Sequence, residues 1–451
     1  MSGLADERLD LSRPVAQLLY DLSEVLLRAS ERDMSPTERF EIMEALGRAG
    51  ERHRKAGYTR NRPGFEAVDV GALKEFLKRA SMAVDATIGV SHRDDDLYHS
   101  YNLLEVEGRE ARIRTLGLML EGQVAALSSG ALSNDEALKL LTALRDSPLH
   151  REDQHSYLLY PDRTISPFFE RNTLPSSWEI LVPNLAPLVK GGNRQLIRMA
   201  DGGSAHFHPD LTNARDLTAL LDELGHESAI MEAIEKDRDA VLGLWETVFN
   251  HKEFTGRSGT MFGFEGLGCI YWHMVAKLLL AVQEVYRESA DEGHDSPPTK
   301  RLAEVYDDVR LGLGFTKTSE VYGAFPVDPY SHTPGHKGAQ QPGMTGQAKE
   351  EILTRIGELG VVIEDGCVCF KPTLLKQREF FTEAHRFEYI DLRGQLQIWD
   401  LEPGSLAFSL FQIPVCYVLG TSASVTLKHV DGSETRIKGS TIPREASSGL
   451  F

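Results

Sequence analysis

Residues 252–284 read KEFTGRSGTMFGFEGLGCIYWHMVAKLLLAVQE, a polar, glycine-rich segment that runs directly into a long apolar helix. The glycines let the backbone approach a ligand closely, and Arg257 and Glu265 supply charge in the same segment. A second stretch of this kind, GAFPVDPYSHTPGHKGAQQPGMTGQ, occupies residues 323–347. Long polar loops between helices are uncommon in compact domains unless they bind or catalyse. These two loops are therefore the first candidates for a functional site.

The composition is that of an ordinary globular protein. The 451 residues are 41% hydrophobic and 26% charged, which leaves room for two or three domains. The formal net charge is -18, with an isoelectric point near 5.3. Nucleic acids and anionic membranes are unsuitable as main partners, because binding phosphate groups requires a clustered basic face.

The cysteines and the apolar runs predict a cytoplasmic protein. Cys269, Cys367, Cys369 and Cys416 show no zinc-binding or CxxC spacing, so they are expected to be reduced thiols. No apolar run approaches the roughly 20 residues of a membrane span. The first residues, MSGLADERLDLSRP, lack the layout of a signal peptide, although a cropped chain would also begin this way.

Apolar residues recur at helical spacing through most of the first three-quarters of the chain. Capping patterns support two of the starts, Ser35 followed by Glu38 and Ser133 followed by Glu136. After Gly360 the pattern changes to short β-prone runs separated by Asp-Gly or Gly-Ser turns. We therefore expect a helical domain over residues 1–359 and a small antiparallel β-sandwich over residues 360–451. The predicted helices are 14–30, 36–48, 71–83, 110–128, 133–145, 214–224, 226–249, 266–289, 298–312 and 346–359.

This succession of helical hairpins, long loops and a terminal β-domain resembles the six-hairpin (α/α)6 toroid of carbohydrate-active enzymes, which include inverting sugar phosphorylases such as cellobiose phosphorylase. EILTRIGELGVVIEDGCVCFKPTLL, residues 351–375, looks like their passage from last helix to capping sheet, and SLAFSLFQIPVCYV, residues 405–418, looks like a core strand pair. The resemblance implies a mainly α toroid followed by a β-sandwich, and an oligosaccharide or polysaccharide substrate. The chain departs from it in lacking a Trp-Asn-Asp-Gly segment and a β-domain before the helices. Other modules of a longer chain are therefore possible partners.

Two acidic residues are the candidate catalytic acids. Cleavage of a glycosidic bond needs a proton donor to the leaving oxygen, usually with a second carboxylate as base or nucleophile. Glu265 lies between the glycine-rich loop and the apolar helix, and Asp328 lies in the second loop before a proline. The alternative interpretations are a first-turn Glu that favours the helix dipole and an ordinary Asp-Pro turn.

Sugar contacts are predicted where acidic and aromatic side chains gather. HRDDDLYHSYN, residues 92–102, contains the candidate sugar contacts Asp95, Asp96 and Tyr98. The alternative interpretation of this sequence is a solvated acidic turn. Trp272, His273 and Tyr330 are further candidates, and the first two could equally pack in a core.

An anion site for inorganic phosphate is predicted in SHTPGHKG, residues 331–338, which contributes His332, His336 and Lys337. Arg257 could hold the same anion from the first loop, near a helix N-terminus. Neither loop has the Walker pattern, and no GxGxxG follows a strand, so we expect no nucleotide cofactor.

The segment HFHPD has the side-chain types of a metal site, because His206, His208 and Asp210 alternate and would project from one face of an extended segment. The His that normally follows the Asp in metallo-hydrolases of the HxHxD type is replaced by Leu211, so a polar substrate loop is favoured and no metal is expected.

Two classes of function remain open. The first is an enzyme that cleaves a glycosidic bond, either a glycoside hydrolase or a phosphorylase; a polysaccharide lyase, in which Arg257 or Lys337 neutralises a uronate carboxylate, is a near neighbour. The second is a non-catalytic carbohydrate-binding or assembly module. Dependence on phosphate separates a phosphorylase from a hydrolase, and an unsaturated product indicates a lyase.

Overall fold

The chain forms two compact units. The computed structural model describes residues 8–30, 34–58, 64–161, 166–226, 230–250, 270–313, 345–429, 431–447 and 449–450. Unit 1 comprises Met1–Leu159 and Ile270–Phe451, and unit 2 is Tyr160–Cys269. Unit 2 is thus inserted into the sequence of unit 1. The boundary predicted between residues 359 and 360 lies within unit 1.

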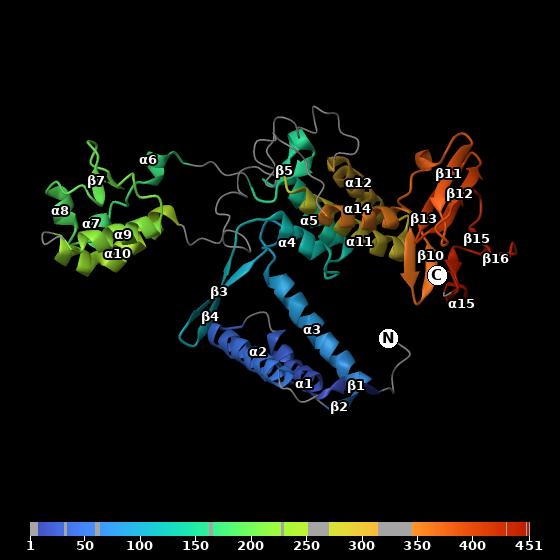
Figure 1. Ribbon diagram of the computed structural model, residues 1–451, viewed down its shortest axis with the longest axis horizontal. Coiled ribbons are helices and arrows are strands. Elements are labelled where there is room, and N and C mark those ends of the chain that lie inside the picture. Colours follow the sequence, from blue (N-terminus) through green and yellow to red (C-terminus); the bar gives the residue numbers. More distant parts are fainter. Residues whose placement is uncertain are drawn as a thin grey trace. The chain divides into compact units, whose positions relative to one another are not determined.

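Three helices and two short strands open unit 1 (Figure 1). Helix α1 (Arg13–Ala29) packs against α2 (Pro36–Gly57) and α3 (Val70–Val90). Strands β1 (Arg8–Ser12) and β2 (Phe65–Asp69) pair antiparallel. The Ser35 side chain accepts a hydrogen bond from the backbone N–H of Glu38, whose carboxylate accepts one from the N–H of Ser35, so the predicted capping box is confirmed.

The next segment corrects the predicted helix 110–128. Strands β3 (Asn102–Glu107) and β4 (Glu110–Thr115) form an antiparallel hairpin, and helix α4 (Leu120–Leu127) begins only after it. Gly108 takes the left-handed conformation that the turn requires, with φ of 59°. Arg114 then pairs with Glu105 across the strands at 2.9 Å. Such cross-strand contacts depend on β3, so the spacing within residues 110–128 could not reveal them.

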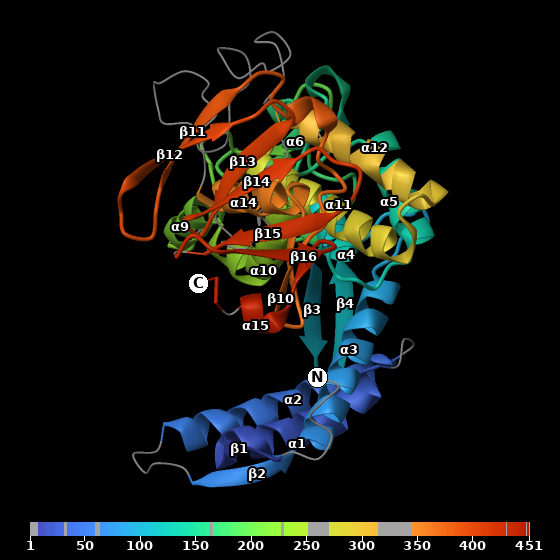
Figure 2. The same cartoon turned by 90° about the vertical axis from the view of Figure 1, so that its right-hand side faces the viewer.

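The centre of unit 1 is helical (Figure 2). Helix α11 (Trp272–Gly293) packs against α4, α5 (Asn134–Asp146), α12 (Pro297–Gly312) and α14 (Thr345–Glu358). Most of the residues of its first four turns are buried. The predicted capping box at Ser133 and Glu136 is present at the start of α5. Two short strands, β5 (His150–Arg151) and β6 (Ser156–Tyr157), form the hairpin that follows α5.

The remainder of unit 1 is built of hairpins, as predicted from the turns. At the first of them, Asp365 and Gly366 have φ of 49° and 78°, as a two-residue type I′ turn requires. Strand β10 also pairs with β17 (Thr441–Ile442), and helix α15 (Arg444–Ser447) follows. The sandwich packing of these hairpins, like the closure of the helices into a toroid, stays a prediction. The hairpins are β9 (Val361–Glu364) with β10 (Cys367–Phe370), β11 (His385–Ile390) with β12 (Leu396–Leu401), β13 (Ser405–Leu410) with β14 (Ile413–Val418), and β15 (Ser424–Lys428) with β16 (Glu434–Lys438).

Unit 2 has its own core. Helices α9 (Ala214–Leu224) and α10 (Met231–Phe249) pack together, and Phe207 and Trp245 are almost fully buried in the cluster that they share. Asp237 of α10 is buried and accepts hydrogen bonds from the backbone N–H groups of Asn184 and Leu185. The shorter elements are α6 (Phe168–Arg171), α7 (Trp178–Leu181), α8 (Ala186–Lys190), β7 (Ile197–Met199) and β8 (Ala205–Phe207).

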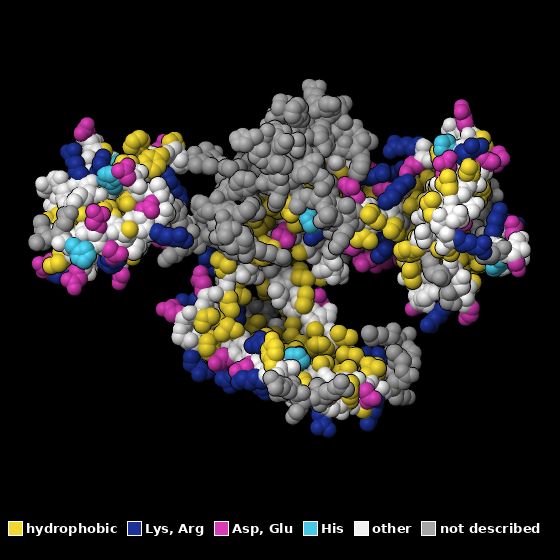
Figure 3. Space-filling model, viewed as in Figure 1, with side chains coloured by type: hydrophobic (Ala, Val, Ile, Leu, Met, Phe, Trp, Pro, Cys, Tyr) yellow, Lys and Arg dark blue, Asp and Glu magenta, His cyan; other side chains and the backbone are white. Residues whose placement is uncertain are grey.

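Apolar side chains also reach the surface of unit 1. Leu104, Val106 and Ile113 of the β3–β4 hairpin are each about half exposed, and hydrophobic side chains are visible on this part of the molecule (Figure 3). Within the described part of the chain, no helix combines the length and the apolar character needed to cross a bilayer.

Candidate functional site

Helices α11 and α14 run parallel, and this fixes where the two predicted loops join the fold. Gln283 of α11 donates a 2.8 Å hydrogen bond to the carbonyl of Thr354 in α14. Lys371 links the C-terminal ends of the two helices. Its backbone N–H donates a hydrogen bond to the carbonyl of Gly360, just after α14, and its ammonium group pairs with Asp291 near the end of α11. The later contact in the sequence of α11 is thus also the later one in the sequence of α14, as expected for two parallel helices.

The two helices also begin at nearly the same level. Gln283 lies about three turns after the start of α11, and Thr354 about two and a half turns after the start of α14. In the sequence, α11 comes shortly after the loop with Arg257 and Glu265, and α14 comes directly after the loop with Asp328. The described starts of α11 and α14 therefore lie at the same end of the helix pair.

A third polar segment approaches this end. A Cβ atom on Gly312, the last residue of α12, would lie 2.3 Å from the carbonyl oxygen of His155, so only glycine fits there. His155 belongs to residues 150–163, HREDQHSYLLYPDR, in which charged and aromatic residues are mixed. His155 therefore lies beside the end of α12.

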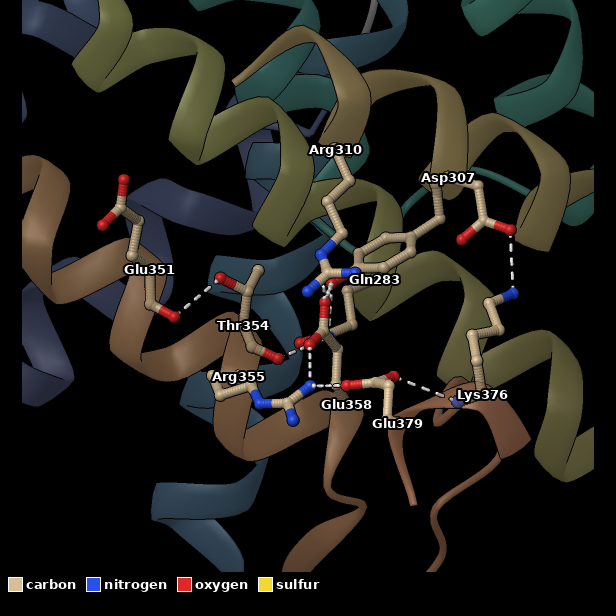
Figure 4. A network of polar contacts seen from close by, with 10 residues as sticks. Gln283, Asp307, Arg310, Glu351, Thr354, Arg355, Glu358, Lys376 and Glu379 are labelled. Carbon is tan, nitrogen blue, oxygen red and sulfur yellow. Dashed lines mark hydrogen bonds and ion pairs between the residues drawn. The ribbon is translucent and has the colours of Figure 1, made fainter. Parts of the chain in front are cut away.

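A buried polar network holds α11, α12 and α14 together (Figure 4). Glu358, whose side chain is 5% exposed, accepts a 2.7 Å hydrogen bond from the Tyr306 hydroxyl. Its carboxylate also pairs with Arg310 at 2.8 Å and with Arg355 at 2.7 Å. Burial, reinforced by the neighbouring Glu358 carboxylate, raises the pKa of Tyr306, so its hydroxyl stays a donor.

Glycine at position 357 permits the close approach on which this network depends. A Cβ atom there would lie 2.1 Å from the side-chain oxygen of Gln283. Arg355 extends the network to Glu379 at 2.8 Å, and Lys376 pairs with Asp307 at 2.8 Å. The network therefore fixes the two helices that follow the predicted loops relative to each other. Sequence reasoning missed it, because its members come from three helices and a loop and share no local motif.

Replacing Glu358 with Ala is expected to lower the free energy of unfolding of unit 1 by about 2–4 kcal/mol. The Tyr306 hydroxyl and the Arg310 guanidinium would lose this acceptor, whereas Arg355 would keep its ion pair with Glu379. Arg310 and Arg355 are 38% and 40% exposed, so water can solvate part of the charge left behind. Urea unfolding, followed by hydrogen exchange in peptides from α11 and α12, measures the loss.

Two further variants sharpen this measurement. Glu358→Gln keeps an acceptor for Tyr306 and should cost less than Glu358→Ala. Glu304→Ala removes an exposed ion pair with Arg301 on α12 and should cost no more than about 1 kcal/mol. Equal losses for the Ala variants of Glu358 and Glu304 would contradict a stabilising role for the network.

The acidic stretch predicted to contact sugar forms a tight, well-anchored turn. The backbone N–H of Arg93 bonds to the carbonyl of Leu97 at 2.8 Å, and Asp96 takes the left-handed conformation, with φ of 59°. Gln123 of α4 is fully buried and bonds to both the N–H and the carbonyl of Tyr98, each at 2.8 Å. The turn is therefore fixed to the core of unit 1.

Asp96 and Tyr98 line a pocket of about 380 Å³ between α3, this turn and the start of α5. The rings of His92 and Tyr98 meet edge to face, with centroids 5.1 Å apart, and His92 Nε2 lies 3.8 Å from an Asp96 oxygen. Burial raises the pKa of Tyr98, and the carboxylates of Glu136 and Asp96 add to this. The polar side chains that line the pocket are Asp85, His92, Asp96, Tyr98, Glu136 and Lys139.

Asp95 has a different place in the turn. Its two carboxylate oxygens accept hydrogen bonds from Arg93 at 2.9 and 2.8 Å, and one of them also accepts the N–H of Leu97. The Arg93 hydrogen bonds hold the pKa of Asp95 below its usual value. Asp95 is not among the residues that line the pocket, so the structure assigns it a part in shaping the turn.

The aromatic candidates at the start of α11 face different surroundings. Trp272 is 5% exposed, which fits the packing interpretation. His273 is partly exposed, and its Nδ1 lies 3.4 Å from the hydroxyl of Tyr271. Of the two, only His273 is accessible to a ligand without rearrangement of the core.

The alternating histidines of unit 2 are held by protein atoms. His206 Nδ1 lies 2.5 Å from the carbonyl oxygen of Asn172, and its Nε2 lies 2.8 Å from the Ser204 hydroxyl. His208 contacts Arg198 through one ring nitrogen and lies 3.6 Å from Asp210 through the other. Over the described ranges, no group of three His, Cys, Asp or Glu side chains is arranged to hold a metal ion.

The remaining predicted site residues lie outside the described residues. They are Arg257, Glu265, Asp328, Tyr330, His332, His336 and Lys337.

One comparison with known proteins connects the chain to a family of enzymes. Residues 165–252 match the family model described as GH149 phosphorylase insertion domain 2. The matched range lies within unit 2, Tyr160–Cys269. The match supports the glycoside phosphorylase-like part of the resemblance, and it does not bear on the toroid. None of the curated proteins matches the chain.

Proposed function

We propose that this chain carries out phosphorolysis of a glycosidic bond in an oligosaccharide or polysaccharide. The observation that carries the proposal is the match of unit 2 to an insertion domain of GH149 phosphorylases. The parallel arrangement of α11 and α14 supports it, because the helix starts that follow the two predicted loops in the sequence lie at the same end of the pair.

The chemistry requires one acid and one anion site. Glu265 or Asp328 donates a proton to the leaving oxygen while the bond from that oxygen to the anomeric carbon breaks. An oxygen of inorganic phosphate forms the new bond to the anomeric carbon, so no protein carboxylate is needed to activate water. His332, His336, Lys337 and Arg257 are the proposed phosphate ligands, and Tyr330 and His273 the proposed sugar contacts.

Helix geometry adds support for an anion at this place. The N-terminal end of a helix has a partial positive charge and unpaired N–H groups, and it therefore favours anions. Helices α11 and α14 present two such ends at nearly the same level. The pocket beside Tyr98 suits phosphate less well, since the described residues that line it include three carboxylates and, as Lys or Arg, Lys139 alone.

A glycoside hydrolase is the second candidate, favoured by the presence of two acidic candidates, Glu265 and Asp328. A retaining or inverting hydrolase uses two carboxyl groups, whereas a phosphorylase can use one. A hydrolase therefore needs the second carboxylate and no phosphate, whereas a phosphorylase needs phosphate and can lack the second carboxylate.

A panel of oligosaccharides, incubated with and without inorganic phosphate and analysed by mass spectrometry, tests the proposal. We expect sugar phosphates only when phosphate is present. Free sugars in both conditions would establish the hydrolase, and an unsaturated product would establish a lyase. No product from any glycan would favour a non-catalytic binding module.

A further inference from the structure

Tyr98 forms part of the lining of the pocket between α3 and α5. Tyr98 is 7% exposed, and its hydroxyl forms no hydrogen bond with any described residue, although its backbone is fully bonded to Gln123. This hydroxyl is not among the enclosed, unpaired side-chain atoms of the described residues, so water reaches it from the pocket, and a ligand hydroxyl can take the place of that water. The Tyr98 side chain lines the pocket, so a bound molecule can reach it.

The charge of the pocket indicates the class of that molecule. Among the described residues that line it, Asp85, Asp96 and Glu136 contribute three carboxylates and Lys139 the single ammonium group. Lys139 forms no ion pair within the described part of the chain. Arg93, which precedes Asp96 in the same turn, already pairs with Asp95. An anionic ligand would meet net repulsion here, whereas a cation would meet net attraction.

The carboxylates of Glu136 and Asp96 can still accept hydrogen bonds from a ligand. Glu136 accepts the N–H and hydroxyl of Ser133 through one oxygen, Oε2, while Oε1 accepts no hydrogen bond from the described residues. The Asp96 side chain is 56% exposed and lies 3.8 Å from His92. An aromatic face beside carboxylates is a favourable environment for an ammonium group.

From these observations we infer that the pocket binds a hydroxylated small molecule that carries an ammonium group, such as an amino sugar. The ammonium pairs with Glu136 and Asp96, and a ligand hydroxyl bonds to Tyr98. Ile88 and Leu132 supply apolar contact for the carbon skeleton. The site is separate from the phosphorolysis proposed above and does not depend on it.

Ligand-observed NMR titration of the full chain tests this inference. Glucosamine, glucose and N-acetylglucosamine are compared at about pH 6.5, where an amine is mostly protonated and carboxylates are ionised. We expect glucosamine to bind about fivefold or more tightly than glucose and N-acetylglucosamine, as one partly exposed ion pair allows.

Three substitutions locate the binding. Glu136→Gln and Asp96→Asn should each weaken glucosamine binding about threefold or more and leave glucose binding unchanged. Gln at position 136 still completes the capping box, so α5 keeps its start. Asp94→Asn is the matched control, because Asp94 lies in the same turn but does not line the pocket.

Three results would overturn the inference: no glucosamine binding, equal binding of glucosamine and glucose, or an Asp94→Asn effect as large as that of Asp96→Asn. The titration contains neither phosphate nor a glycosidic bond. Failure of the proposed phosphorolysis would therefore leave its result unaffected, and the two proposals can be rejected separately.

Discussion

Replacing Glu265 with Gln is expected to reduce phosphorolysis by about 100-fold to 10,000-fold, the usual contribution of a general acid. The amide cannot donate a proton to the leaving sugar oxygen, while its size and shape are nearly those of the acid. The loss should be concentrated in turnover, because the proton is transferred only in the transition state. Initial rates of sugar phosphate formation at saturating glycan and phosphate measure it.

The leaving group distinguishes an acid from a merely structural residue. A nitrophenyl glycoside releases an oxygen that needs little protonation, so Glu265→Gln should retain far more activity on it than on an oligosaccharide. Glu253→Gln, in the same segment, serves as the control and should remain active on both. If Glu265→Gln is fully active and Asp328→Asn shows this pattern, the acid is Asp328.

Replacing Trp245 with Ala is expected to destabilise unit 2 by about 3–5 kcal/mol. Trp245 is 1% exposed, and its ring lies 4.3 Å from that of Phe249 and 5.0 Å from that of Phe207, measured between centroids. Ala removes both aromatic contacts and leaves a large cavity. Hydrogen exchange should show lost protection in peptides from α9 and α10.

The effect should be confined to unit 2, whose core cluster comprises residues between Leu174 and Val248. Peptides from α11 and α12 should therefore keep their protection. Ile180→Ala is the control within unit 2, since Ile180 is 81% exposed and should cost little. A loss of protection throughout the chain after Trp245→Ala would contradict the independence of the two cores.

The elements that could be predicted from the sequence are those that local chemistry specifies. The capping boxes at Ser35 and Ser133 mark helix starts, and the Asp365-Gly366 pair marks a hairpin. Helices α11, α12 and α14 follow from apolar spacing over three or more turns. At 110–115 the same criterion failed, because the pairing of β4 with β3 is not visible in the spacing of one segment.

Unit 2 and the sites depend on contacts that are distant in sequence. Unit 2 begins with helices of only four or five residues and strands of three, which give almost no periodic signal. The sequence of residues 92–98 indicated a polar turn. It could not show that Glu136 and Lys139 of α5 line the same pocket. Glu358 looks like any polar residue of a helix until Tyr306 and Arg310 meet it from α12.

The most direct test of the central claim is to run the reaction with inorganic phosphate in water labelled with oxygen-18 and to determine the mass of the product. In phosphorolysis the oxygen bonded to the anomeric carbon comes from phosphate, so we predict a sugar phosphate without the label. A free sugar that carries the label at its anomeric carbon would show that water is the nucleophile, and it would contradict the assignment of this chain as a glycoside phosphorylase.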